Sequence, residues 1–430
     1  MATDQLTSDP AVQTSRDMLA ILASGYSPRD FAVRFWDGSR LEPEAGREAL
    51  FTLVLKHPGA MKKMLWPPDG VAFAEAYVYD DFDIEGDIFA FFRFTQFLIK
   101  KKPGLWDLLK VGVSLLRLPS VKRDRTGHQP VKLAGRKHSL ERDKQAVGYH
   151  YDLSNEFFGL WLDENLLYTC AYFANAEETL EAAQERKLDY ICRKLRLKPG
   201  ERFLDIGCGW GGLVIHAAKH YGVEAVGVTL SQRQVESSNE RIDRAGLKGR
   251  CRVEYRDYRE ISDAKGFDKM ASVGMLEHLG ESMMPVFFRE AYRLLKPGGV
   301  FLNHLITLKA NTPFPRWTNF ARKYVFPDGE LRPLTVSLRE AENAGFEVRD
   351  VESLREHYAL TLEHWLRRLE ARHEEVNRAS DETTFRVFRL YLAGARMGFV
   401  NGVYNIHQEL LAKPDGGKSG LPLMRSDWYA

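Results

Sequence analysis

The chain has 430 residues, and its 61 lysines and arginines nearly balance its 59 aspartates and glutamates, so the formal net charge is +2. This length favours two domains over one, and an apolar content of 44% is enough for a sizeable core. No uninterrupted apolar run is long enough to span a bilayer. We expect a cytosolic protein with no nucleic-acid partner, whose contact with membranes is confined to their surface.

Neither the cysteines nor the segment at His373 gives a sign of a metal centre. The cysteines form no CxxC pair and have no zinc-finger spacing, which favours reduced intracellular thiols at Cys170, Cys192, Cys208 and Cys251. His373 is followed by two glutamates but by no second histidine at helical spacing, so no metal site is predicted. The N-terminus lacks the basic and then apolar pattern of a signal peptide.

Residues 17–99 have the pattern of a small mixed domain. A helix is predicted over residues 18–22, and strands are predicted over residues 31–36 and 51–55. The acidic run from Asp80 to Asp87 lacks the spacing of a calcium loop. We interpret it as a solvated turn.

Residues 88–125 combine bulky apolar side chains with basic ones. Between residues 91 and 140 there are twelve lysines and arginines against two aspartates, and Lys100, Lys101 and Lys102 are consecutive. Such a segment can lie in the plane of an anionic membrane. Alternatively, its apolar residues face the core of the domain and its lysines form a solvated face. Composition alone leaves both interpretations open.

Residues 126–139 are polar and basic, and we interpret them as a linker that separates one domain, 1–139, from a second, 140–430. In the second domain strands alternate with helices, which predicts a doubly wound, mostly parallel α/β fold with added helices. The predicted strands cover residues 202–206, 225–228, 251–255, 267–273, 300–306 and 346–351. The predicted helices cover residues 178–195, 213–218, 231–245, 285–295, 358–369 and about 381–410.

A glycine-rich turn links the strand at 202–206 to its helix. Gly207, Gly209 and Gly211 let the backbone pass close to a ligand, and the start of the helix presents free N–H groups. A nicotinamide dinucleotide site uses a similar turn, and a purely structural turn is a third interpretation.

Two features separate these interpretations. Asp205 lies on the strand just before the first glycine, where it can hold a polar or cationic part of a ligand. The next strand ends in Thr229, Leu230 and Ser231, without the acid that binds the ribose in nicotinamide folds. Both features favour S-adenosylmethionine as the ligand, and therefore a methyl-donor enzyme.

Five segments that follow one another in the chain resemble the cyclopropane-fatty-acid synthases and the related mycolic-acid cyclopropane synthases. They are His150–Phe158, Leu167–Phe173, Val228–Gln234, Ser272–Gly280 and His357–Trp365. The resemblance covers about residues 145–410. More loosely, the first domain is similar to the lipid-binding domain of the longer bacterial synthases, which favours the membrane interpretation of residues 91–125.

The resemblance implies methylene transfer from S-adenosylmethionine to the cis double bond of an unsaturated phospholipid acyl chain. It implies an enzyme attached peripherally to an anionic membrane surface on the cytoplasmic side, and it allows a homodimer. The donor site implied by the turn and by the resemblance comprises Tyr168, Thr169, Asp205, Gly207, Gly209, Gly211, Thr229, Leu230, Gln234, Asp257 and Tyr258. Asp257 and Tyr258 are expected near the adenine, where an aromatic ring can stack.

In this family the base is held to be a bound bicarbonate, and the resemblance assigns its cradle residue by residue. Glu277, His304 and Tyr391 match the family's side chains, and Cys170 and Ile306 match positions that contribute through their backbone. Without the family, Glu277 and His278 at a strand end form a plausible acid/base pair. His304 and Tyr391 alone are typical of a satisfied core histidine and of core packing.

One position departs from the family. Many members carry a cysteine in the late helix where this chain has Ala395, so covalent cysteine catalysis there is impossible in this chain. Two other functions remain open. One is a fatty-acyl methyltransferase that makes a methyl or methylene branch of the 10-methyl type, and the other is a non-catalytic lipid-binding protein.

Overall fold

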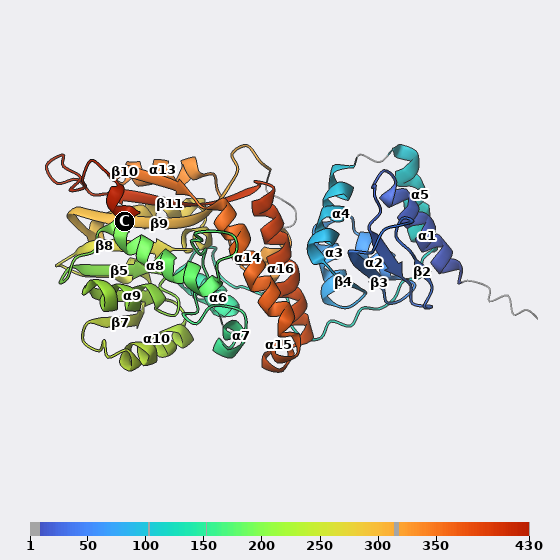
Figure 1. Ribbon diagram of the computed structural model, residues 1–430, viewed down its shortest axis with the longest axis horizontal. Helices are drawn as coiled ribbons and strands as arrows, with labels where there is room; N and C mark the ends of the chain where they lie inside the picture. The colour runs from blue at the N-terminus through green and yellow to red at the C-terminus, as the bar shows by residue number, and fades with distance from the viewer. Residues whose placement is uncertain (1–8, 102–103, 152, 314–317, 430) are drawn as a thin grey trace, which may run out of the picture. The chain divides into compact units, whose positions relative to one another are not determined.

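The computed structural model describes residues 9–101, 104–151, 153–313 and 318–429 (Figure 1). Lys102 and Asp152, which belong to segments singled out above, lie outside the described residues. The chain divides into two compact units. The first comprises residues 1–129, 315–320 and 381–397, and the second comprises residues 130–314, 321–380 and 398–430. The domain boundary near residue 140 stays a prediction.

The first unit contains a four-stranded sheet in the order β2-β1-β3-β4, in which only the β1–β3 pair is parallel. The strands are β1 (Phe31–Arg34), β2 (Arg40–Leu41), β3 (Phe51–Leu55) and β4 (Phe82–Gly86). The helices are α1 (Pro10–Ala23), α2 (Ala60–Leu65), α3 (Gly70–Val78), α4 (Ile88–Lys100) and α5 (Leu105–Arg117). The predicted strands at 31–36 and 51–55 are therefore confirmed.

The acidic run from Asp80 to Asp87 is not a solvated turn, and that prediction was wrong. Most of it forms β4, which pairs with β3 and buries Phe82 and Ile84. Asp81 is buried as well, and its Oδ2 accepts a hydrogen bond of 2.8 Å from Arg123 Nε. The alternation of apolar and acidic residues is a strand pattern, and the buried carboxylate is stable because a guanidinium pairs with it.

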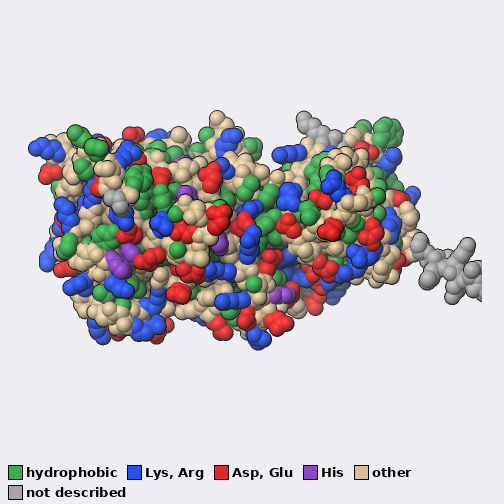
Figure 2. All heavy atoms as spheres, viewed as in Figure 1, with side chains coloured by type: hydrophobic (Ala, Val, Ile, Leu, Met, Phe, Trp, Pro, Cys, Tyr) green, Lys and Arg blue, Asp and Glu red, His purple; other side chains and the backbone are tan. Residues whose placement is uncertain are grey.

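The apolar and basic segment separates into two helices with different roles. α4 buries Phe91 and Phe94 in the core of the first unit. In contrast, α5 buries only Leu115, while Trp106 is 76% and Leu116 is 81% exposed. Figure 2 shows hydrophobic side chains gathered at the surface where Figure 1 places α5. The core interpretation therefore holds for α4 and not for α5.

Lys101 has a structural role rather than a solvated one. Its Nζ donates hydrogen bonds to three carbonyl oxygens at the end of α1, those of Ile21 at 2.7 Å, Leu22 at 3.2 Å and Ser24 at 2.8 Å. A lysine there satisfies carbonyls that have no partner within the helix. Among the described residues, no helix combines the length and the apolar content needed to cross a membrane.

The second unit contains a seven-stranded sheet in the order β10-β11-β9-β8-β5-β6-β7. The strands from β5 to β9 are parallel to one another, and β11 and β10 extend the sheet in antiparallel fashion. The strands are β5 (Arg202–Ile206), β6 (Glu224–Thr229), β7 (Cys251–Tyr255), β8 (Phe267–Val273), β9 (Leu295–Leu308), β10 (Glu347–Ser353) and β11 (Tyr404–Ala412). The predicted α/β class is confirmed.

The helices of this part of the chain follow the predicted alternation. They are α6 (Leu140–Tyr151), α7 (Asn155–Gly159), α8 (Leu180–Leu195), α9 (Gly212–Tyr221), α10 (Gln232–Arg244), α11 (Met284–Leu294), α12 (Thr318–Tyr324), α13 (Leu334–Asn343), α14 (Arg355–Ala371), α15 (His373–Ala379) and α16 (Glu382–Val400). Short 3-10 turns follow β7 and β8, at Tyr258–Glu260 and Leu276–His278. These turns lie at the carboxyl ends of the parallel strands, where α/β sheets place their ligands.

The late helix predicted over about residues 381–410 is wrong in its last third. α16 ends at Val400, and residues 404–412 form β11, which is inserted between β9 and β10. The spacing of Ile406 and Leu410 imitates a helix, but β11 is buried on both faces as an interior strand. α16 as far as Met397 belongs to the first unit. There Arg386 donates to the Tyr77 carbonyl at 2.9 Å, and Arg389 donates to the Ile84 carbonyl at 3.0 Å.

Candidate functional site

The glycine turn between β5 and α9 requires glycine for two different reasons. Gly207 has φ +80°, and a Cβ there would lie 2.9 Å from Met275 Cγ, so a side chain would collide with the neighbouring loop. Gly211 has φ +76° and precedes the first residue of α9, and a Cβ there would lie 3.2 Å from Ser238 of α10. Gly207 therefore lets the turn pass close to the loop that carries Met275, while Gly211 lets α9 and α10 pack together.

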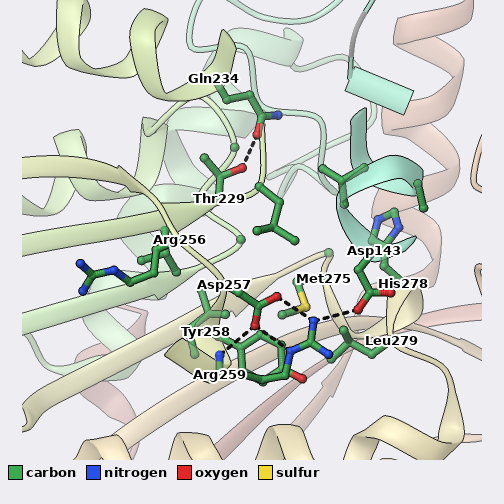
Figure 3. A pocket seen from close by; sticks show the side chains of 18 of the residues that line it. Asp143, Thr229, Gln234, Arg256, Asp257, Tyr258, Arg259, Met275, His278 and Leu279 are labelled. Atoms are coloured by element: carbon green, nitrogen blue, oxygen red, sulfur yellow. Dashed lines mark hydrogen bonds and ion pairs between the residues drawn. The ribbon is translucent and has the colours of Figure 1, made fainter. Parts of the chain in front are cut away.

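One cavity beside this turn, which we call the Thr229 cavity, is lined by Gly207, Gly209, Thr229, Leu230, Gln234, Asp257 and Tyr258 together with Asp143, Arg259 and Met275 (Figure 3). Thr229 Oγ1 donates a hydrogen bond of 2.6 Å to Gln234 Oε1. Both side chains are buried, so this bond fixes the end of β6 against the start of α10. The structure brings together here seven of the predicted donor-site residues.

Asp257 is already paired within this cavity. Its Oδ1 accepts from Arg259 Nε at 2.7 Å and its Oδ2 accepts from an Arg259 amino group at 2.7 Å. The same guanidinium donates to Asp143 Oδ2 of α6 at 2.8 Å, and the dashed lines in Figure 3 join the three side chains. Tyr258 packs edge-on against Phe287 with ring centroids 5.5 Å apart. Asp257 therefore shapes the wall of the cavity through Arg259.

A second cavity on the other side of the turn, which we call the Asp205 cavity, is lined by Tyr168, Thr169, Lys187, Asp205, Gly207 and Gly209, among others. Asp205 is buried, and its Oδ1 has no hydrogen-bond partner among the described residues. Burial raises the pKa of Asp205 to about 7, although the charge of Lys187 opposes this shift. A buried carboxyl oxygen without a partner is costly, which is typical of a group that binds a ligand.

Lys187 of α8 provides a cation in the same cavity. Its side chain is buried, with 2% exposed, and its Nζ donates a hydrogen bond of 2.8 Å to Thr169 Oγ1. Burial lowers the pKa of Lys187 to about 8, while the nearby carboxylates of Asp163 and Asp205 act in the opposite direction. The carboxyl group of Asp205 and the amino group of Lys187 in one cavity suit a ligand that itself carries an amino group and a carboxylate.

An aromatic group adjoins the Asp205 cavity. The Tyr168 ring lies 5.2 Å from those of Trp161 and Trp365 and 5.7 Å from that of Phe158, measured between centroids. Trp161, Trp365 and Phe158 are fully buried. Tyr168 is the member of this group that lines the cavity, and an aromatic ring there can attract a cation, including a sulfonium.

Glu277 and His304 carry unpartnered polar atoms next to these cavities. The Glu277 carboxylate accepts a hydrogen bond from the Ile306 backbone N–H, but its Oε2 has no partner among the described residues. Neither ring nitrogen of the buried His304 has a hydrogen-bond partner in the described part of the chain. Gly274 links the two, because its N–H donates to the His304 carbonyl at 2.8 Å and it borders both cavities.

Burial shifts both groups towards their neutral forms. Desolvation raises the pKa of Glu277 from its ordinary value of 4.5 to about 7. Desolvation, reinforced by the positive charges of Lys187 and Lys194, lowers the pKa of His304 well below its ordinary value. A protonated carboxyl and a neutral imidazole can each donate one hydrogen bond to an anion without repelling it. The residues therefore fit a small oxyanion such as bicarbonate.

The structure brings only part of the predicted cradle together. Ile306 reaches Glu277 through its backbone, and Cys170 is buried with its Sγ donating to the Ala171 carbonyl at 3.3 Å. Tyr391 lies on α16 in the first unit, so its place in the cradle stays a prediction. The roles of the other predicted site residues also stay predictions.

Sequence reasoning missed Lys187, Arg259 and Asp143. Lys187 lies in a helix rich in charged residues, where a lysine normally faces solvent, so no signal marked it as buried. Arg259 directly follows Asp257 and Tyr258, and this adjacency was the available hint. Asp143 lies near the predicted domain boundary, in a segment that showed no motif.

The sheet and its glycine turn define the class I fold of S-adenosylmethionine-dependent methyltransferases. The solved mycolic acid cyclopropane synthase CmaA1 complexed with SAH and CTAB has this fold, with a TM-score of 0.60, 33% identity, and coverage of 62% of this chain and 97% of that one. Residues 138–409 match the mycolic acid cyclopropane synthetase family. The chain belongs to this family of lipid-modifying methyltransferases, as its sequence motifs predict.

Two curated relatives extend the comparison. A probable fatty acid methyltransferase of Pseudomonas putida is 36% identical over 401 residues, which cover 92% of this chain and 95% of the relative. The cyclopropane-fatty-acyl-phospholipid synthase of Escherichia coli K12 is 37% identical over 300 residues, which cover 69% of this chain and 75% of the relative. Residues 21–96 match a domain of unknown function.

Proposed function

We propose that this protein transfers a methylene group from S-adenosylmethionine to the cis double bond of an unsaturated phospholipid acyl chain, forming a cyclopropane ring. The observation that carries the proposal is the pair of buried groups, Glu277 and His304, which have polar atoms without partners among the described residues and lie beside the donor cavities. Simple methyl transfer to an amine or hydroxyl does not need an anion cradle in an apolar site.

The donor would be held from both sides of the glycine turn. In the Asp205 cavity, Asp205 would bind the α-ammonium group of the donor and Lys187 its carboxylate, which would direct the sulfonium towards the aromatic group around Tyr168. In the Thr229 cavity, Leu230 and Tyr258 would contact the adenine. Fixing the methyl in line with the alkene is worth several kcal/mol, because an alkene is a poor nucleophile.

The chemistry then requires a base and a dry site. The alkene carbon bonds to the methyl carbon, the sulfur keeps the bonding electrons as a thioether, and the acyl chain becomes a carbocation. Loss of a proton from the new methyl group lets the ring close. A bicarbonate held by Glu277 and His304 would supply the base for that proton. The aromatic group around Tyr168 would keep out water, which would otherwise trap the cation as an alcohol.

The test is to incubate the full chain with methyl-labelled S-adenosylmethionine and vesicles of a mono-unsaturated phospholipid. We expect labelled lipid that gains the mass of one CH2 and shows ring methylene protons upfield of ordinary chain protons in its NMR spectrum. Vesicles with saturated chains are the control and should acquire no label. If the donor is not consumed with either vesicle, the protein is a lipid-binding protein and the proposal is wrong.

A second candidate is the fatty-acyl methyltransferase, in which the proton leaves from another carbon and an alkene remains. It is favoured by the relative from Pseudomonas putida, which matches both units and is called a probable fatty acid methyltransferase. The same incubation separates the two, because a methyl branch beside the remaining double bond gives a branch-methyl signal and vinyl protons instead of upfield ring protons. Ala395 agrees with either product, since neither requires a cysteine at that position.

We also propose that α5 contacts the lipid surface. Its exposed apolar side chains, including Trp106 and Leu116, are interleaved with the exposed Lys110 and Arg117, as in helices that lie in the membrane interface. Lys101 is excluded from this role because it caps α1.

The membrane proposal is tested by co-sedimentation with anionic vesicles. Replacing Trp106 with glutamine should weaken binding by about 1.5 kcal/mol, roughly tenfold, because one large apolar side chain no longer leaves water. Trp66→Gln is the matched control, since Trp66 is also a tryptophan of the first unit with 65% of its surface exposed. Equal losses in the two variants would show that α5 is not the contact surface.

A further inference from the structure

A cluster of two histidines and one glutamate lies outside the donor cavities and the cradle. His216 and His220 are four residues apart on α9, so they project from the same face of the helix. Glu185 faces them from the neighbouring α8. One ligand atom from each of the three side chains lies within 4.8 Å of the other two. Figure 2 shows histidine side chains at the surface in the region where Figure 1 places α9.

His216 supplies a second, independent observation. Its side chain is 6% exposed, and its Nε2 is buried with no hydrogen-bond partner among the described residues. Its Nδ1 lies 3.2 Å from Glu185 Oε1, and the His216 and His220 rings are tilted by 33° with their centroids 4.5 Å apart. Imidazole nitrogens are among the commonest ligands of zinc in proteins.

The surroundings allow a cation to enter. The three side chains line one cavity together with Asp189, Arg186 and Arg193. The two arginines in its wall are already paired, Arg186 with Glu178 and Arg193 with Asp189 at 2.6 Å. Glu185 and His220 are exposed, so small side-chain rotations can bring their ligand atoms to metal-bonding distance.

We propose that Glu185, His216 and His220 bind one divalent transition-metal ion, of which Zn²⁺ fits best. Two imidazoles and one carboxylate are a usual zinc ligand set, and a water molecule completes four-coordination. The ion joins the middle of α8 to the end of α9, away from the glycine turn at which α9 begins. Its role is to hold the two helices together, and the proposal does not depend on the lipid chemistry.

The test is titration of the full chain, untagged and freed of metal by dialysis against a chelator, with ZnCl2 in a calorimeter. We expect one equivalent of Zn²⁺ to bind and to raise the melting temperature, because an ion that binds only the folded state stabilises it. Substituting Co²⁺ should give the visible absorption of a four-coordinate nitrogen and oxygen site. Binding of less than half an equivalent, or no absorption band, would overturn the proposal.

Two exposed ligands allow variants that keep the fold. His220→Ala and Glu185→Gln should each weaken Zn²⁺ binding at least tenfold and abolish the rise in melting temperature. Glu240→Gln on α10 and His373→Ala on α15 are the matched controls and should bind Zn²⁺ as the unchanged protein does. Equal affinity in all four variants would assign the bound ion to other histidines, and the contact between His216 and Glu185 would then be an ordinary hydrogen bond.

Discussion

The two cavities on either side of the glycine turn differ in how their polar groups are satisfied. In the Thr229 cavity, Thr229 bonds to Gln234 and Asp257 bonds to Arg259, with the Tyr258 hydroxyl as an exception. Around the Asp205 cavity, Asp205 and the nearby Glu277 and His304 all carry buried polar atoms without partners in the described chain.

This difference indicates that the two cavities have different roles, one in shaping the site and the other in binding charged groups. The Thr229 cavity is built before any ligand arrives, so its residues chiefly provide a surface of fixed form. The groups around the Asp205 cavity store a desolvation cost that only a ligand can relieve, so they should respond strongly to the donor and to the anion. If this is right, substitutions on the two sides should differ in size and in kind.

The largest effect should come from Glu277→Gln. The amide no longer presents the acidic oxygen that the anion cradle requires, so turnover should fall by roughly 10²–10⁴-fold. Donor affinity should stay within about twofold, because Glu277 does not line either cavity. Label transfer and calorimetry measure the two quantities, and Glu281→Gln, in the same loop and half exposed, is the control. Unchanged turnover would remove Glu277 from the cradle.

Glu277 should also make the free energy of unfolding depend on pH. The folded protein raises the pKa of Glu277 from 4.5 to about 7 and therefore binds this proton more tightly than the unfolded chain. The stabilisation is fully present below pH 4.5 and is lost as the pH rises through about 7. Urea unfolding at pH 5 and pH 8.5 should show that the stability of the protein relative to Glu277→Gln falls by about 3 kcal/mol. A constant difference would mean that the carboxyl is solvated.

The sequence alone predicts Glu277 as one member of an acid/base pair, and only the resemblance to a known family predicts its place in an anion cradle, whereas the elements that position it follow from general pattern. β5, β7 and β8 lie where the apolar runs predict them, and the alternation of strands and helices is enough to identify the fold class. By contrast, the helix predicted over about residues 381–410 includes residues 404–410, which belong to β11. An interior strand has no alternating pattern to reveal it, and only its pairing with β9 and β10 decides its state.

Burial of charge is what sequence pattern predicts least well. The side chains of Lys187 and Asp81 are fully or almost fully enclosed, although both lie in segments rich in charged residues. Each is stable because of a partner that is distant in the sequence, Thr169 for Lys187 and Arg123 for Asp81. Such partners can be identified only once the chain is folded. For this reason the glycine turn was predicted as part of the donor site, and Lys187 was not.

Asp205→Asn tests the unsatisfied side through donor binding. Replacing the carboxylate removes the charge that would pair with the donor's ammonium group and keeps the size of the side chain. Affinity for S-adenosylmethionine should fall by about 1.5–3 kcal/mol, roughly 10- to 150-fold, as for a hydrogen bond to a charged group. Calorimetry measures the change, and Asp243→Asn, exposed on α10, is the control. A loss below threefold would show that Asp205 only packs behind the turn.

Thr229→Val should have the smallest effect and tests the satisfied side. The substitution removes the hydroxyl that donates to Gln234 Oε1 and leaves that buried oxygen without its partner. The free energy of unfolding should therefore fall by about 1 kcal/mol, while donor affinity should be nearly unchanged. Because the cost is internal, it should be the same with and without donor, whereas that of Asp205→Asn should grow when donor is added. Denaturant unfolding of both variants in the two conditions measures this. If Thr229→Val responds to the donor as Asp205→Asn does, the two cavities are not different in kind.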